Sequence, residues 1–179
     1  MSDYENQRSR AVSPVLRTKD AVVDEQGTAV IPAGTREIFD MAFQENPQMI
    51  RVVLPDSVRK VGSRAFAGCE NLREVHLNDG LEILEGNVFN GCTRLEELVL
   101  PSSLRQVHAY AFNHTSFRTP LYDRSGTILY HYPEQAPVTF FAVPQGVKRL
   151  AHGAFLGCAA LEAVRLPESL EVIEREAFV

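Results

Sequence analysis

Apolar residues recur along most of this 179-residue chain at a period of 23 residues, far longer than the period of a helix or a strand. An Ala-Phe or Val-Phe pair marks each unit, and successive pairs lie 23, 23, 23, 43 and 23 residues apart. The phenylalanines of this column are Phe43, Phe66, Phe89, Phe112, Phe155 and Phe178. Repeats of this length are typical of solenoids, in which each unit packs only on its neighbours.

A second column of aliphatic residues keeps the same register, and most of its members are followed by proline. The column consists of Ile31, Leu54, Leu77, Leu100, Val143 and Leu166. Apolar and polar residues alternate around it, as in Val75-His76-Leu77, which predicts a short strand with one buried face. No single unit can bury both this face and its phenylalanine, but stacked units can. The pattern therefore predicts a repeat solenoid with a parallel sheet of short strands on one face, and turns and 3-10 segments on the other.

The repeat unit resembles a known family. The run from Leu54 to Leu72 reads aliphatic-Pro-x-Ser-Val-x-x-Val-Gly-x-x-Ala-Phe-x-Gly-Cys-x-x-Leu, which is similar to the BspA-type leucine-rich repeat. The resemblance covers about Ala21 to Val179, in six copies. It implies a curved, right-handed solenoid whose strands line one face, and a scaffold without a fixed ligand. Many members of the family are surface-displayed bacterial proteins involved in adhesion.

One interruption breaks the period, where the spacing of 43 residues adds 20 to a unit and forms a variant segment at about 118–140. The stretch Asp123–Gly126 has the residues of a hairpin turn, between two segments of strong strand propensity. We expect a β-hairpin or an atypical rung here. Because insertions in solenoids often project at the binding face, Tyr122, Tyr130 and Tyr132 are predicted to belong to a contact surface.

The ends of the chain differ from the repeats. Residues 1–20 are polar and predict a disordered leader, followed by a single domain over 21–179. The stretch Ala21–Gly27 is a candidate edge strand that shields the first rung. The last repeat is truncated at Phe178-Val179, with no polar capping unit after it. We expect either a fragment of a longer protein or an end that associates weakly with a second copy.

The open sheet face supplies the other candidate binding residues. The strand positions that point away from the core are Val53, His76, Val99 and Arg165, and the two valines flank the histidine. The first hypothesis is a non-catalytic module that binds a protein or a glycan, as a segment of a bacterial surface or adhesion-type protein. The alternative is a structural spacer or a self-association element with no ligand of its own.

The cysteines and histidines do not form a chemical motif. Cys69 and Cys92 share a column with Asn46 and Thr115, residues whose small side chains can hydrogen-bond a turn of backbone. This exchange predicts a structural role for the thiols. No pair of histidines has a metal-ligand spacing, and neither a nucleophile elbow nor a phosphate loop occurs. We therefore expect no catalytic residues, no metal and no cofactor.

Charge and hydropathy limit the classes of partner and the location of the protein. The net charge of -5 and the pI near 5.6 argue against nucleic acid, and glutamates interrupt the basic pairs of the repeats. No apolar run approaches the roughly 18 residues that span a membrane. The polar amino terminus also lacks the apolar stretch of a secretory signal. The expected location is therefore the cytoplasm for a complete chain, and the cell surface or the exterior for a segment of a longer protein.

Overall fold

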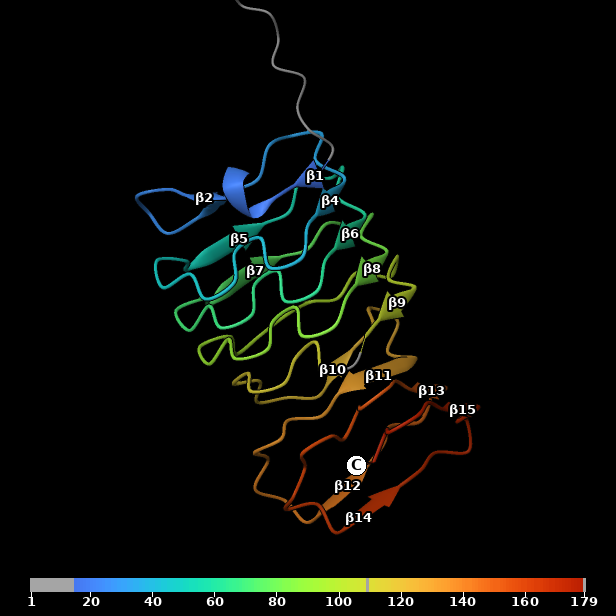
Figure 1. Cartoon of the computed structure of the whole chain (residues 1–179). Coiled ribbons are helices and arrows are strands. Elements are labelled where there is room, and N and C mark those ends of the chain that lie inside the picture. Colours follow the sequence, from blue (N-terminus) through green and yellow to red (C-terminus); the bar gives the residue numbers. More distant parts are fainter. Residues whose placement is uncertain (1–14, 109, 179) are drawn as a thin grey trace, which may run out of the picture.

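The computed structural model describes residues 15–108 and 110–178, and it is a parallel β-solenoid of about seven turns. Figure 1 shows these turns, called rungs below, stacked one on another along the chain. The repeat solenoid predicted from the sequence is thereby confirmed. Within the described residues, the only helical element is the short 3-10 turn η1 (Thr18–Asp20). Hydrogen-bonded turns connect the strands instead, for example with Ala65 N–H donating to the carbonyl of Gly62.

The first ladder contains the strands predicted around the aliphatic column. Its strands are β2 (Val22–Val23), β3 (Ala29–Val30), β5 (Arg51–Val53), β7 (Glu74–His76), β12 (Phe140–Ala142) and β14 (Ala163–Arg165). β2 and β3 form an antiparallel hairpin, and a bridge between Thr28 and Arg51 joins β3 to β5. The pairs β5–β7 and β12–β14 are parallel. Between these pairs the ladder is interrupted, because residues 97–99 form no strand.

A second ladder, which the sequence pattern did not predict, runs along another side of the stack. Its strands are β1 (Val15–Leu16), β4 (Glu37–Ile38), β6 (Lys60–Val61), β8 (Ile83–Leu84), β9 (Gln106–Val107), β11 (Ile128–His131), β13 (Arg149–Leu150) and β15 (Val172–Ile173). Neighbours in this order pair in parallel, except that no pairing joins β9 to β11 among the described residues. Most of these strands bury one aliphatic residue, such as Val61 or Leu84, against the core, whereas both residues of β15 are exposed. The two-residue length of most of these strands explains why the alternation of polar and apolar residues did not reveal them.

The phenylalanine column forms a stack in the core. The ring centroids of Phe43 and Phe66 lie 5.4 Å apart, those of Phe66 and Phe89 5.6 Å, and those of Phe89 and Phe112 6.3 Å. The four rings are nearly parallel and buried. Adjacent rungs also share backbone hydrogen bonds at this column, as where Phe66 N–H donates to the carbonyl of Val88. Stacking therefore satisfies both the apolar side chains and the polar backbone of each rung.

Two columns of left-handed residues make the turns on either side of each phenylalanine. The first column is Met41, Arg64, Asn87, Tyr110, Gly153 and Glu176, and the second is Glu45, Gly68, Gly91, His114 and Gly157. A left-handed conformation costs roughly 1–2 kcal/mol for a residue that has a Cβ atom. Glycine occupies three of the five positions of the second column, and the remaining rungs tolerate the strain of Glu45 and His114.

The interruption of the period is a shortened rung. Tyr132 takes the place of phenylalanine in the column, 20 residues after Phe112 and 23 before Phe155, and its N–H donates to the carbonyl of Ala154. β10 (Leu121–Tyr122) turns back to pair antiparallel with β11, so a hairpin lies within this rung. β11 continues straight to His131, where regular rungs make a left-handed turn. The hairpin and the missing turn account for the shorter spacing.

The predicted leader over 1–20 lies outside the described residues as far as residue 14. Its remaining part includes β1, which pairs with β4 and buries Leu16 in the core, so residues 15–20 are not the disordered segment that we expected. The expected edge strand in Ala21–Gly27 corresponds to β2. The hairpin of β2 and β3 lies against the first rung.

Candidate binding surface

A row of exposed aliphatic side chains crosses the first ladder. The register pairs Val22 with Val30, places Val30 beside Val53 and pairs Val53 with His76. Val99 follows on the next rung, one unit of 23 residues beyond His76. The four valines, called the valine row below, have exposed fractions of 56% (Val22), 45% (Val30), 45% (Val53) and 77% (Val99). Figure 1 shows β2, β5 and β7, which carry Val22, Val53 and His76, one beneath another on the left of the stack.

Val22 and Val30 were not among the residues proposed from the sequence. Val30 lies 23 residues before Val53 and so belongs to the same column, whereas Val22 lies outside the 23-residue units. The signal for them is local: the apolar pairs Val22-Val23 and Ala29-Val30 flank the turn residues around Gly27. The hairpin that these pairs form lengthens the predicted patch by two strands. Val22, Val30 and Val53 thus form an exposed apolar strip, of a kind typical of interaction sites.

Charged side chains lie beside the valine row on the same strands. Arg51 Nη2 lies 2.6 Å from Glu74 Oε1, and His76 Nε2 lies 2.5 Å from the same oxygen. Hydrogen bonds from Arg51 and from His76 lower the pKa of the Glu74 carboxyl. All three side chains are about half exposed, so they form a polar border on the sheet face. Polar borders around an apolar strip are the usual arrangement of protein interfaces.

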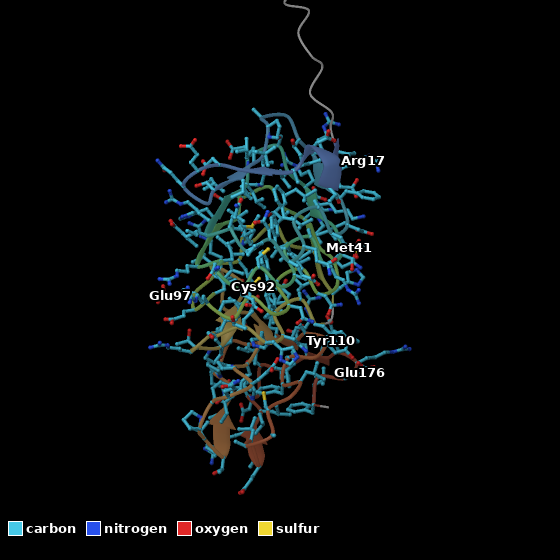
Figure 2. All side chains as sticks on the ribbon, turned by 60° about the vertical axis from the view of Figure 1, so that its left-hand side comes forward. Arg17, Met41, Cys92, Glu97, Tyr110 and Glu176 are labelled. Carbon is cyan, nitrogen blue, oxygen red and sulfur yellow. The ribbon has the colours of Figure 1, made fainter. Side chains whose placement is uncertain are left out.

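A groove lies between β7 and the segment that follows it in the ladder. It encloses about 300 Å³ between residues 73–77 and 97–101. Among the described residues, no backbone hydrogen bond joins 73–77 to 96–100. Asp79 and Arg124 line the groove, and their ion pair measures 3.4 Å from Nη1 to Oδ1. Figure 2 shows Glu97, another lining residue, at the surface, whereas Cys92 of the same rung lies inside.

Arg165 and Tyr122 lie apart from the valine row. Arg165 is on β14, in a separate two-stranded sheet with β12, and its guanidinium carbon lies 5.4 Å from the ring centroid of Phe140. Tyr122 is on β10 and half-buried, and burial raises the pKa of its hydroxyl. The structure therefore brings Val53, His76 and Val99 together, and it places the other two candidates elsewhere.

The prediction that Tyr130 and Tyr132 lie on a contact surface is wrong. Their exposed fractions are 6% and 4%. The ring of Tyr132 packs 4.5 Å from Phe141 and 5.3 Å from Phe155, measured between centroids, because it fills the phenylalanine position of its rung. Burial raises the pKa of the Tyr130 hydroxyl. Both tyrosines are core residues because the variant segment closes a rung instead of projecting from one.

The cysteine column has the structural role expected from the sequence. The thiol of Cys69 donates to the carbonyl of Phe43 at 3.1 Å, and that of Cys92 donates to the carbonyl of Phe66 at 3.2 Å. Thr115, in the same column, donates its hydroxyl to the carbonyl of Phe112 at 2.7 Å. Burial raises the pKa of Cys69 to about 11 and raises that of Cys92 further. Such thiols are inert at neutral pH.

The described part of the chain offers no chemical centre of another kind. Within residues 15–108 and 110–178, no group of three or more His, Cys, Asp or Glu side chains is arranged to hold a metal ion. No helix in the same residues has the length and the apolar character that crossing a bilayer requires. His131 is buried against Phe112 and Phe117, and this burial lowers its pKa to about 4.

Comparison with known proteins agrees with this architecture. A sequence model of the BspA type leucine-rich repeat region, in six copies, matches residues 26–133 and 127–179. No curated protein sequence matches the chain. Among solved structures, the leucine-rich repeat protein TpLRR of T. pallidum is similar at 27% identity, over 84% of this chain and 72% of that chain, with a TM-score of 0.57.

Two further bacterial structures share the fold. The pneumococcal vaccine antigen PcpA is 22% identical over 76% of this chain, with a TM-score of 0.59. The chain covers 44% of PcpA, which is less than half of that protein's solved chain. A leucine-rich repeat protein from Eubacterium ventriosum is 15% identical over 88% of this chain and 60% of that chain, with a TM-score of 0.52.

Proposed function

Because the chain belongs to the BspA-type leucine-rich repeat family, we propose that it is a non-catalytic module that binds a protein partner on the strand face of its amino-terminal rungs. The observation that carries the proposal is the valine row, in which Val22, Val30 and Val53 lie in register across neighbouring strands and Val99 is exposed one rung beyond His76. Ordinary surfaces expose such residues singly, whereas a continuous strip is a feature of interfaces.

The chemical groups of the valine row favour a protein over a glycan as the partner. Its accessible groups are aliphatic, and the charges of Arg51, Glu74 and His76 already contact one another. A standard protein interface buries roughly 800 Å² on each side. Five strand positions spaced by about 4.8 Å provide only part of that area. The partner is therefore expected to cover the groove beside the row as well.

The test uses peptides of twelve residues, selected from a random display library on the intact chain. We expect their dissociation constants to rise at least tenfold for the triple variant Val53→Asp, His76→Asp, Val99→Asp. The matched control is Met41→Asp with Tyr110→Asp, because both side chains are exposed and Figure 2 shows them on the side opposite Glu97. Equal affinity of the triple variant and the wild type would overturn the proposal. So would binding confined to glycans on an array probed with the same labelled chain.

Self-association is a second candidate function, and the last rung favours it. Phe178, Leu166, Val172 and Ile173 are all exposed, although their columns are buried or half-buried in most other rungs. Phe178 and Leu166 border an open apolar pocket of about 520 Å³ together with Phe155 and Leu161. A second copy of the chain could cover this face with its own last rung. Sedimentation equilibrium should then show a dimer that Leu166→Asp with Ile173→Asp abolishes, and a monomer at all concentrations would contradict this function.

A further inference from the structure

We propose that the groove between β7 and residues 97–101 binds an extended segment of the partner protein, which pairs by backbone hydrogen bonds with the interrupted first ladder. The inference rests on the proposed function, because it specifies how a partner would occupy the strand face. It adds the conformation of the bound segment and the groups that recognise it.

The interruption leaves strand edges without partners. In a strand, alternate residues direct their N–H and C=O groups to opposite neighbours. β7 uses one edge for β5, through the carbonyl of His76, which accepts from Leu54 N–H at 2.9 Å. Its other edge, which includes the N–H and C=O of Val75, points toward residues 97–99. No hydrogen bond crosses that gap in the described residues, so these groups remain available to a ligand.

The interrupted rung lies next to the variant rung. β10 follows residues 97–99 in the ladder and pairs antiparallel with β11. A single bridge, between Leu100 and Asp123, joins the two rungs on this side. The gap between β7 and residues 97–101 therefore lies inside the stack, with rungs on both sides, and not at a frayed end of the chain.

The walls of the groove suit a peptide backbone. Val75, Leu98 and Leu100 are buried and form an apolar base, and Val99 stands exposed at the rim. Around them lie charges of both signs, from Arg73, Glu74, Asp79, Glu97 and Arg124. Alternating donors and acceptors over an apolar base are what an added strand recognises, with main-chain bonds giving affinity and small pockets giving specificity.

A helix laid along the valine row would be a poorer occupant. A helix satisfies its backbone groups internally, so it would offer none to the unpaired edges of the ladder. It would bury the valines but leave the backbone groups of the groove without partners, and an unsatisfied buried polar group weakens binding. An extended segment satisfies both the apolar and the polar groups.

The experiment uses the twelve-residue peptides selected on the intact chain and two readouts. In the first, each peptide is N-methylated at one residue at a time. Strand pairing predicts that methylation lowers affinity at least tenfold at every second position and leaves the intervening positions within twofold. In the second, amide exchange followed by NMR should slow at least tenfold for Val75 and Val99 on binding, with the amide of Phe39, outside the groove, as the control.

The outcomes separate this inference from the proposed function. Peptides whose binding is insensitive to the triple aspartate variant would overturn both. Peptides that are sensitive to that variant, but show no alternation on N-methylation or bind as a helix, would overturn only the extended conformation. A library that yields no binder on this face would also count against the inference. Alternation together with slowed exchange supports it.

Discussion

The first four rungs and the last three share one sequence pattern but differ in how completely they bury it. In the first four, three consecutive ring pairs are stacked, and the strands of the second ladder pair without a break from β1 to β9. In the last three, Phe141 and Tyr132 tilt against Phe155, and Phe178 stacks on Phe155 but is 48% exposed on its other side. The buried apolar residues form two clusters, divided near the variant rung.

The difference shows that a repeat position is fully buried only where other elements cover its rung on both sides. The same phenylalanine is a core residue in the middle of the stack and a half-exposed surface residue at its end. The variant rung interrupts both ladders. In the first ladder, β10 pairs antiparallel with β11, and in the second ladder, β9 does not pair with β11. The predictions below test this contrast between the two regions.

The largest expected effect is the loss of a stacked ring. Replacing Phe66 with alanine should lower the free energy of unfolding by about 4 kcal/mol, because the ring is fully buried between two others. The same change at Phe178 should cost only about 1 kcal/mol, since half of that ring is exposed. Denaturation by urea measures both. Equal losses at the two positions would show that the regions do not differ.

His131 makes the boundary between the regions sensitive to pH. Its folded pKa of about 4 lies below the ordinary value of 6.5, because burial disfavours the charged ring. Its contribution to stability is therefore present above pH 6.5 and is lost as the pH falls toward 4. The loss should approach about 3 kcal/mol. We expect unfolding curves between pH 7 and 4 to show this decline.

The control for that prediction is His131→Phe, which keeps an aromatic ring against Phe112 and Phe117 but cannot be protonated. The variant should lose less stability than the wild type over the same range of pH. A variant with the same pH dependence as the wild type would assign the effect to carboxylates elsewhere.

Substitutions in the second left-handed column should change the stability of the fold by a smaller amount, with opposite sign in two neighbouring rungs. Gly91→Ala should destabilise the fold by about 1 kcal/mol, because its φ is +76° and a Cβ atom there would meet nothing closer than 3.6 Å, so strain alone acts. His114→Gly, at the same position of the next rung, should stabilise it by a similar amount, since His114 has a φ of 54°. Thermal unfolding of the two variants provides the measurement. Shifts of the same sign would argue against the strain of this column.

The smallest expected effect is on the valine row. Val99→Asp should change the free energy of unfolding by less than about 0.5 kcal/mol, because the side chain is mostly exposed. Leu98→Asp, one residue away and buried, should be severely destabilising. Urea denaturation distinguishes them. A large loss at Val99 would mean that the row stabilises the fold instead of serving a partner.

The repeat columns predicted the stack because every rung must bury the same positions. Val53, His76 and Val99 could be placed on one face for the same reason. Tyr132 was wrongly predicted to lie on a contact surface. It lies 23 residues before Phe155, but its spacing from Phe112 is only 20. Tyr132 occupies the phenylalanine column, but the shortened rung places it off the 23-residue period counted from Phe112.

The groove could not be predicted from the sequence. Glu97-Leu98-Val99 has the same alternation as Glu74-Val75-His76, yet only the latter forms a strand. Residues 97–99 lie between β7 and the variant rung, whose strand β10 pairs in a hairpin with β11, and they pair as a strand with neither. Strand formation here depends on pairing across rungs, and that information is not local.

The central claim, that a partner docks on the strand face of the amino-terminal rungs, can be tested most directly by NMR of valine methyl groups. The chain is titrated with a peptide selected on it, and each valine is followed separately. We predict that the methyl signals of Val22, Val30, Val53 and Val99 move, whereas those of Val138 and Val172, exposed elsewhere, stay in place. Shifts at Val138 or Val172 with an unchanged valine row would contradict it.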